Sequence, residues 1–288
     1  MKKIVVTGGS GRLGQHAIRE LLSHDYSVLS LDRVPPPEKL CSSWVIDLRN
    51  SGNIFEALKD AYGIIHLGAY QAPNLVPDSE TFSNNVTATY NVLKAASELN
   101  VKKVVLASST AAFGFIYAQK PFLPEYLPVD EKHPSKPQDS YGLSKVVGEQ
   151  IADSMVTVNK EISVSSLRFP GVIFDFSYEL VRERWKDPKG RTSGFWAYVD
   201  ARDAATACRL ALEAKFTGHE VIIVAAPRSS MKESTDELIN KYLSPAIKTK
   251  PGLTGNWSGV DSTKAQKLLG FKAIHLWENY LKRRKNTE

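Results

Sequence analysis

A glycine-rich turn between an apolar strand and an amphipathic helix occupies the start of the chain. The sequence Thr7-Gly8-Gly9-Ser10-Gly11-Arg12-Leu13-Gly14 follows the apolar run 3–7 and opens a helical pattern over 11–24. Glycines at this spacing permit a tight turn, close approach of the backbone to a pyrophosphate, and close helix–strand packing. The helix N-terminus offers unpaired N–H groups to the anion. The turn predicts a bound dinucleotide, with contacts from Gly8, Ser10, Gly11, Arg12, Leu13 and Gly14.

The next strand ends in an acidic residue that is followed by a basic one. Asp32 lies 18 residues beyond Gly14, close to the ~20-residue separation at which a carboxylate binds the adenosine ribose. This favours NAD, because a carboxylate repels a 2′-phosphate. Arg33 follows directly, and a guanidinium can hold that phosphate, so NADP stays open as an alternative.

Apolar strands alternate with helical patterns through the N-terminal half. Such strands predict a parallel sheet covered by helices on both faces. Right-handed crossover connections then add strands on either side of the first one, which gives a doubly wound sheet. We therefore predict the α/β class with a doubly wound parallel sheet, a Rossmann fold. The expected strands are 3–7, 26–32, 44–47, 63–67 and 103–107, and the expected helices are 11–24, 54–59 and 80–99.

The pattern changes after the fifth strand. Residues 115–139 hold five prolines, which argues against a helix or a central strand, and we expect this long loop to form a wall of the active site. We predict a Rossmann domain over 1–168 and a small, interleaved substrate-binding lobe over 169–288, with 201–225 returning to the sheet. The later elements expected are a helix 141–158, a strand 162–167, an irregular segment 170–198, a helix 201–214, a strand 221–225 and a mostly helical remainder.

Composition and charge narrow the class of protein. Hydrophobic residues make up 42% of 288 residues and the net charge is +6. The basic residues are dispersed except at 282–285, a pattern typical of a solvated helix end and not of nucleic-acid binding. No apolar run approaches the ~20 residues of a membrane span, and the first strand leaves no room for a signal peptide. Cys41 and Cys208 lack disulfide or metal-ligand spacing. We expect a cytoplasmic protein without metal, membrane or nucleic-acid partners.

A tyrosine and a lysine four residues apart open the expected helix 141–158. Tyr141 and Lys145 share one helix face. An ammonium beside a phenol stabilises the phenolate and lowers the tyrosine pKa, which makes Tyr141 a candidate general acid or base. The fifth strand ends in Ser108-Ser109-Thr110, at the sheet edge where ligands bind in this class, and a serine there can orient the reacting oxygen.

These residues together resemble the short-chain dehydrogenase/reductase superfamily, specifically its extended, NAD-dependent epimerase/dehydratase branch. The resemblance covers nearly the whole chain. It implies that Asp47 and Leu48 lie near the adenine, that Leu67, Gly68 and Ala69 follow the fourth strand beside the cofactor, and that Asn85 is the family's helix asparagine. Further matching segments are Ser108–Gly114, Tyr141–Lys145, Leu167–Pro170 and Tyr198–Ala204.

The resemblance also implies a mechanism. Lys145 holds the nicotinamide ribose and lowers the pKa of Tyr141, Tyr141 takes the hydroxyl proton, and Ser109 orients that oxygen while hydride passes to the nicotinamide. The catalytic residues expected are therefore Ser109, Tyr141 and Lys145. The substrate-binding residues expected are Tyr70, Ser109, Thr110, Phe113, Pro170, Gly171 and Arg191.

The choice of substrate rests on arginines. Nucleotide-sugar enzymes of this branch carry arginines before the late Val-x-Asp segment and in a late motif, but 192–198 and 252–259 contain none. The sequence resembles the uronate dehydrogenases more than those enzymes. Uronate dehydrogenases are NAD enzymes that oxidise the anomeric hydroxyl of free sugar acids. In that group an arginine five residues before a tryptophan binds the substrate carboxylate, and Arg191 stands five before Trp196. Pro170-Gly171 departs from the group's Gly-Ser, so a free aldose or another small polyol stays open.

Three functions follow in order of preference. The first is an NAD(P)-dependent dehydrogenase acting on a hydroxyl of a free sugar or sugar acid. The second is a nucleotide-sugar 4-epimerase or dehydratase with tightly bound NAD. The third is a non-catalytic dinucleotide-binding regulator. Relatives dimerise through the helices beginning near 80 and 141, so the resemblance also implies a homodimer or higher homo-oligomer.

Overall fold

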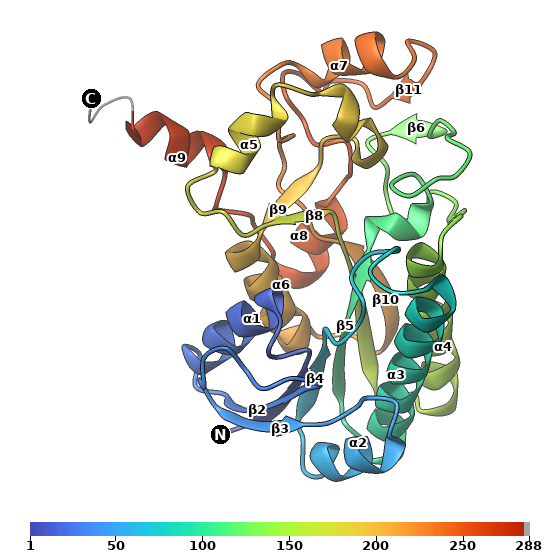
Figure 1. The fold of residues 1–288 in the computed structure, drawn as a ribbon, viewed down its shortest axis with the longest axis vertical. Helices are drawn as coiled ribbons and strands as arrows, with labels where there is room; N and C mark the ends of the chain where they lie inside the picture. Colours follow the sequence, from blue (N-terminus) through green and yellow to red (C-terminus); the bar gives the residue numbers. More distant parts are fainter. Residues whose placement is uncertain (285–288) are drawn as a thin grey trace.

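A seven-stranded parallel sheet forms the centre of the protein (Figure 1). The computed structural model describes residues 1–284, with side chains as far as residue 281. The strand order is β10-β7-β5-β4-β1-β2-β3, which reverses direction between β1 and β4 and so confirms the doubly wound fold. The strands are β1 Lys3–Thr7, β2 Ser27–Asp32, β3 Ser42–Val45, β4 Gly63–His66, β5 Lys103–Ser109, β7 Ser163–Phe169 and β10 Gly218–Ile223.

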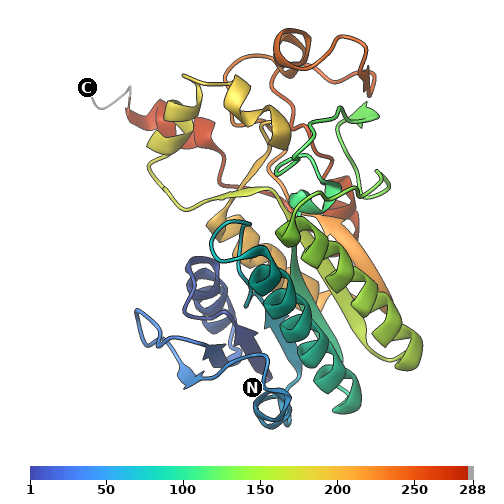
Figure 2. The ribbon, with the colours of Figure 1, turned by 45° about the vertical axis from the view of Figure 1, so that its right-hand side comes forward.

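Helices cover both faces of this sheet. Ile4 and Val6 of β1 pack toward α1 and α6, whereas Val5 between them packs toward α2, α3 and α4, because successive strand side chains point to opposite faces. Figure 2 shows α3 and α4 side by side along one face. The helices are α1 Arg12–Leu22, α2 Ser51–Leu58, α3 Asp78–Glu98, α4 Ser140–Val158 and α6 Ala201–Glu213.

Short elements gather beyond the carboxyl ends of the strands, at the top of Figure 1. Strand β8 (Gly171–Ile173) pairs with β9 (Tyr198–Asp200), and β6 (Tyr126–Leu127) pairs with β11 (Lys248–Thr249). A third hydrophobic cluster, built around Phe115, Phe195 and Trp257, holds this part together. The remaining elements are the 3₁₀ helices η1 Thr110–Phe113 and η2 Lys189–Gly194, and the helices α5 Glu179–Arg184, α7 Thr235–Tyr242, α8 Thr263–Leu269 and α9 Trp277–Arg284.

Several expected strand boundaries were wrong, and so was the expectation of a mostly helical C-terminal part. The third strand begins at Ser42, two residues before the expected start, because β3 is an edge strand whose pairing with β2 and not its apolar run sets its position. Strand β10 begins at Gly218, where it meets β7, instead of at 221. The segment 170–198 holds two short strands and two short helices. Between 226 and 284, the described part of the remainder, turns and loops predominate around three short helices and β11, so this part is not mostly helical.

Two further expectations concern helices. Within the described residues, no helix combines the length and the apolar character that a membrane span requires. The side chains of the basic run 282–285 lie outside the described part of the chain, although the backbone of 282–284 belongs to α9.

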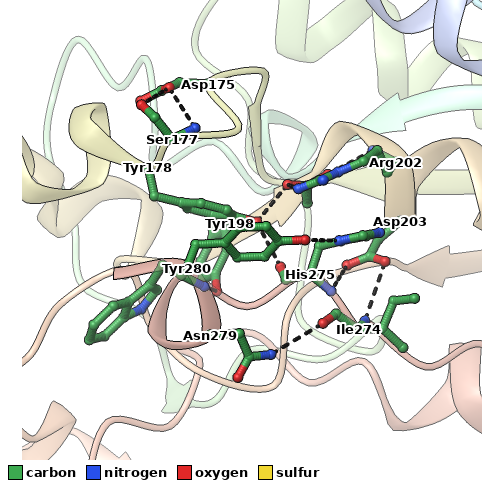
Figure 3. A network of polar contacts seen from close by, with 12 residues as sticks. Asp175, Ser177, Tyr178, Tyr198, Arg202, Asp203, Ile274, His275, Asn279 and Tyr280 are labelled. Carbon is green, nitrogen blue, oxygen red and sulfur yellow. Dashed lines mark hydrogen bonds and ion pairs between the residues drawn. The ribbon is translucent and has the colours of Figure 1, made fainter. Parts of the chain in front are cut away.

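A polar network ties Tyr178, at the start of α5, to the end of β9 and to the C-terminal segment (Figure 3). The buried carboxylate of Asp200 accepts two hydrogen bonds from the Arg202 guanidinium, both at 2.8 Å. The Tyr178 hydroxyl lies 2.5 Å from Asp200 Oδ2 and 2.9 Å from the carbonyl oxygen of His275. Asp203 accepts the backbone N–H groups of 274 and 275. Because a buried charge is tolerated only with such partners, the segment 175–178 is fixed in position.

His66 at the end of β4 is a buried histidine held in its neutral form. The Gly68 N–H donates to Thr7 Oγ1, so the Thr7 hydroxyl hydrogen is left for His66 Nδ1 at 2.7 Å, and Nε2–H faces Thr89 Oγ1 at 3.2 Å. Burial, with a smaller contribution from the nearby Lys145, lowers the pKa of His66 from 6.5 to about 3. The neutral ring therefore satisfies both of its nitrogens without a charge.

This depressed pKa makes stability depend on pH. Below pH 6.5 the unfolded histidine takes up a proton that the folded one refuses, so the stabilisation is complete above pH 6.5 and is lost as the pH falls toward 3. We expect the free energy of unfolding of the wild type to fall with decreasing pH more steeply than that of His66→Gln, by up to about 1.4 kcal/mol per pH unit between pH 6 and 4. Urea denaturation at each pH measures this difference. Parallel profiles for the two proteins would contradict the assignment.

Candidate active site

A cleft of about 800 Å³ lies at the carboxyl ends of the strands and collects most of the predicted site. Its walls come from the turns after β1, β2, β4, β5 and β7, the first turns of α4, and η2. This is the edge of a doubly wound sheet where ligands bind. The predicted residues that line it are Gly8, Ser10, Gly11, Arg12, Leu13, Gly14, Asp32, Arg33, Asp47, Leu48, Leu67, Gly68, Ala69, Tyr70, Ser109, Tyr141, Lys145, Pro170, Gly171 and Arg191.

The glycine turn leaves an open anion cradle at the start of α1. Gly8 has a φ of +69°, and its N–H donates to the Leu31 carbonyl at 2.8 Å. A Cβ on Gly14 would lie 2.1 Å from the Gly8 carbonyl oxygen, so a side chain there is incompatible with the turn. No side chain caps the N-terminus of α1, and its first turn contains no acidic residue. Its N–H groups and the positive end of the helix dipole therefore face the cleft.

Acidic and basic groups stand together at the end of β2. Asp32 Oδ2 accepts the Ser10 N–H at 3.0 Å, and Oδ1 accepts the Arg33 N–H at 2.7 Å. The Arg33 guanidinium turns away from Asp32 and donates to the Tyr70 hydroxyl at 2.9 Å. Asp47 is bound through both carboxylate oxygens by Arg49, and this hydrogen bonding lowers its pKa. The carboxylate of Asp32 and the guanidinium of Arg33 thus both face the cleft.

Tyr141 and Lys145 lie at the base of the cleft on the first turns of α4. The Asp139 carboxylate caps this helix by accepting the Gly142 N–H at 2.7 Å. Lys145 Nζ lies 5.4 Å from the centroid of the Tyr141 ring and donates to the Ala107 carbonyl of β5 at 2.8 Å. Ser109 ends the same strand and lines the same cleft. The three predicted catalytic side chains therefore converge.

The pKa of Tyr141 is raised in this structure, whereas the neighbouring Lys145 led us to expect a lowered one. Burial raises the pKa of Tyr141 to about 12, and the neighbouring Ser109 side chain only partly opposes this shift. Burial also lowers the pKa of Lys145 to about 8, against the opposing effect of Glu149. In this structure burial is the largest influence on both pKa values, because desolvation disfavours the charged form of both groups.

A buried ion pair supports the base of the cleft, and the sequence analysis missed it. Arg168 on β7 binds both carboxylate oxygens of Glu149 on α4, at 2.8 and 2.6 Å. Ser108 donates to the same carboxylate at 2.6 Å, and Arg168 also donates to Ser135 of the 115–139 loop at 3.1 Å. Glu149 stands one helical turn after Lys145. The pair thus joins α4, the sheet and the loop beneath the catalytic residues.

Three predicted contact residues lie outside the cleft. Asn85 is buried and bonds the Tyr70 backbone and Ser144 Oγ, so it joins α3 to the cleft wall and α4. Thr110 and Phe113 are buried in η1, where Phe113 packs in the third hydrophobic cluster. Both are therefore packed in the interior, and neither is among the residues that line the cleft.

Other lining residues were not predicted. Asn84, and not the predicted Asn85, lines the cleft. Of the 115–139 loop, only Ile116 and Tyr117 line the cleft. Tyr117 packs edge-on against Tyr141 with ring centroids 6.2 Å apart, so this start of the loop does form a wall beside the phenol. The other unpredicted lining residues include Val34, Gln71, Leu75, Phe169, Val172 and Phe174.

The crowding at Gly14 generates a test of the cradle. We expect Gly14→Ala to weaken NAD binding at least tenfold, because the added Cβ meets backbone at 2.1 Å and the turn must open. Gly148→Ala, on α4, is the matched control, since its Cβ would make an ordinary contact with Thr89 of α3 at 3.5 Å. Isothermal titration with NAD measures both. Wild-type affinity in Gly14→Ala would exclude this turn as the binding site.

Comparisons with known proteins agree with this geometry. Residues 4–174 match the NAD dependent epimerase/dehydratase family. A UDP-glucose 4-epimerase of Lactobacillus helveticus is 32% identical over 164 residues, which are 52% of this chain and 46% of that protein. The chain covers 46–62% of the length of the first curated relatives it matches.

Two solved structures share the fold at low identity. A UDP-glucose 4-epimerase from Bifidobacterium longum, in complex with NAD+ and UDP, has a TM-score of 0.71 and 21% identity, covering 99% of each chain. Uronate dehydrogenase from Agrobacterium tumefaciens has a TM-score of 0.70 and 18% identity, covering 100% of this chain and 90% of that one. The family match and the site together show that the chain belongs to the NAD dependent epimerase/dehydratase family.

Proposed function

We propose that this protein is an NAD-dependent dehydrogenase that oxidises a hydroxyl group of a free sugar or sugar acid. The observation that carries the proposal is the distribution of positive charge along the cleft. Arg12 and Arg33 stand at the glycine-turn end, whereas Arg191, on η2, is the one other arginine among the described lining residues. One guanidinium suits a single carboxylate, while a nucleotide diphosphate calls for more cations.

The residues of the glycine-turn end fit NAD. The cradle that a Cβ on Gly14 would fill, together with the free N–H groups of α1, suits the pyrophosphate, and Asp32 suits the adenosine ribose. Asp47 and Leu48 would lie at the adenine, and Lys145 would bind the nicotinamide ribose. When bound, NAD supplies the hydride acceptor.

The chain's own residues handle the proton. In the proposed mechanism, Ser109 holds the substrate hydroxyl while the phenolic oxygen of Tyr141 takes its proton. A phenol with a pKa of about 12 is a poor base at neutral pH until a positive charge stabilises its phenolate. Lys145, with a pKa of about 8, carries that charge at neutral pH. Its bond to the Ala107 carbonyl holds the ammonium in place.

A UDP-glucose 4-epimerase is the second candidate, and the curated relatives favour it. An epimerase returns the hydride to its substrate, so it forms no net NADH. The absence of arginines from 192–198 and 252–259 weighs against it. The third candidate, a silent dinucleotide-binding regulator, is weakened by the convergence of Ser109, Tyr141 and Lys145 in one cleft.

Absorbance of the reduced cofactor separates these candidates. We expect net NADH formation when the protein is mixed with NAD and a panel of hexuronates and aldoses, with NADP run in parallel because of Arg33. Conversion of UDP-glucose to UDP-galactose without net NADH would overturn the proposal in favour of the epimerase. No turnover of either kind would favour the regulator.

The phenol provides the mutational test of the mechanism. We expect Tyr141→Phe to lower kcat at least 100-fold with little change in NAD affinity, because general acid–base catalysis contributes about 10²–10⁴-fold. Tyr90→Phe, at an exposed tyrosine of α3, is the control and should keep wild-type kcat. Steady-state kinetics with the substrate found above measures both. An active Tyr141→Phe variant would remove Tyr141 from the mechanism.

We also keep a cytoplasmic location and a homodimer through α3 and α4 as proposals. These helices pack side by side and leave Tyr90, Leu143 and Val158 exposed. Light scattering of the purified protein measures the mass, and a monomer at micromolar concentration would contradict the dimer.

A further inference from the structure

Lys145 borders two cavities, the cleft and a second, much smaller one. The small cavity has a volume of about 20 Å³ and shares Ala107, Ser108 and Lys145 with the cleft. Among the described residues that line it, Glu149 is the one acidic residue and Lys145 is the one lysine. Because these two stand four positions apart on α4, their side chains share a helix face. An ammonium and a carboxylate therefore border the same small space.

A second connection between Glu149 and Lys145 runs through β5. The Ser108 hydroxyl donates to Glu149 Oε1 at 2.6 Å. The residue before it, Ala107, accepts a hydrogen bond from the Lys145 ammonium at its carbonyl oxygen, at 2.8 Å. The residue after it is Ser109, one of the three predicted catalytic side chains. Glu149 therefore holds the stretch of strand to which Lys145 is bonded.

The other titratable groups around this ammonium come from four elements. His66 on β4 borders the small cavity and is neutral, because burial lowers its pKa to about 3. Tyr141 on α4 has a pKa of about 12, and Tyr117 of the 115–139 loop, which packs against it, also has a raised pKa because it is buried. Both phenols are therefore neutral at pH 7. Arg168 on β7 is a cation, but it binds both carboxylate oxygens of Glu149.

Burial and Glu149 act on Lys145 in opposite directions. Desolvation lowers the pKa of Lys145 to about 8, and the charge of Glu149 opposes this shift. A further fall would leave much of the lysine uncharged at neutral pH, and a neutral amine does not stabilise a phenolate. The carboxylate can itself stay ionised in a buried place because Arg168 and Ser108 bond it.

We propose that Glu149 is a positioning residue of the reaction, which holds Lys145 as an ammonium ion beside the phenol, and that Arg168 acts in turn by holding Glu149 as a carboxylate. This inference rests on the proposed function for the use that it gives to the ammonium. The charge itself can be measured in the protein without substrate or cofactor. The buried ion pair is then more than a brace between α4 and β7, because its two partners act on Lys145 with opposite signs.

The two partners supply variants that distinguish an effect on charge from mechanical support. Glu149→Gln keeps the shape of the side chain, removes its charge and leaves the buried Arg168 unpaired. The pKa of Lys145 should therefore fall by about one pH unit or more. Arg168→Met breaks the same pair but leaves the carboxylate beside Lys145, whose pKa should rise. A brace without an effect on charge would not shift the two variants in opposite directions.

Trace acetylation of the purified full-length protein measures these shifts. Acetic anhydride reacts with the neutral amine, so the rate of acetylation of Lys145 from about pH 6 to about pH 11 gives its pKa. Lys145 lines the cleft and is accessible to the reagent, and mass spectrometry quantifies the peptide that contains it. Lys160, an exposed lysine just beyond α4, is the internal reference. Asp153→Asn is the matched control, because it removes an exposed carboxylate of the same helix that pairs with His219, and it should leave Lys145 unchanged.

Thermal unfolding shows which variants are folded. If Arg168→Met is not, the double variant Glu149→Gln/Arg168→Met takes its place, since removal of both charges of a buried pair is often tolerated. The pKa of Lys145 in the double variant should then lie above its value in Glu149→Gln, because no unpaired guanidinium remains.

Two results would overturn the inference. One is the same pKa of Lys145 in the wild type and in Glu149→Gln, and the other is a fall in this pKa in both single variants. The readout needs no substrate, so it is separate from the fate of the proposed function. Opposite shifts without NADH formation from any sugar would keep the inference and reject the dehydrogenase, whereas NADH formation with an unshifted Lys145 would do the reverse.

Discussion

The close approach of the turn after β1 to the end of β4 governs the arrangement of the whole site. A Cβ on Gly8 would lie 2.7 Å from the Gly68 backbone nitrogen, and one on Gly14 would meet the Gly8 carbonyl. Only glycine lets these segments touch, and their contact brings the positive end of α1 to the edge where β4 and β5 end. Because β5 carries Ser109 and faces α4, the same contact sets the distance between the anion cradle and Tyr141.

The catalytic end of the cleft depends on a second, buried interaction. The Glu149–Arg168 pair joins α4 to β7, and both side chains are less than one-tenth exposed. Removing one partner of such a pair typically costs about 3–5 kcal/mol, because the other charge is left buried alone. Through Ser108 and Ser135 the pair also orders the end of β5 and the 115–139 loop. The position of Lys145 on α4 is therefore fixed by an interaction one helical turn away.

The sequence predicted well the elements whose positions depend on residues close to them in the chain. The strand, turn and helix at 3–24 and the pair Tyr141–Lys145 depend on neighbouring residues, and the sequence located them within a few positions. The edge strand β3 was misplaced because its pairing partner decides its register. Asn84 and Asn85 show the limit of motif transfer. One position on a helix is a rotation of about 100°, which moves a side chain from the cleft to the contact with α4. Thr110 and Phe113 are buried for a different reason, because the 3₁₀ helix η1 follows β5 directly.

The positions of charged side chains along the cleft were the hardest property to predict from the sequence. The proposed substrate depends mainly on them. The sequence leaves Arg33 available to a phosphate, but in the structure its guanidinium donates to the Tyr70 hydroxyl. A phenol that is to lose its proton in a buried site benefits from cations nearby, but an anionic substrate group close to it would raise its pKa again. Lys145 stands at the phenol, whereas Arg191 stands on η2, a different wall of the cleft. The proposed sugar acid, with its carboxylate at Arg191 and its reacting hydroxyl at Tyr141, would meet both demands.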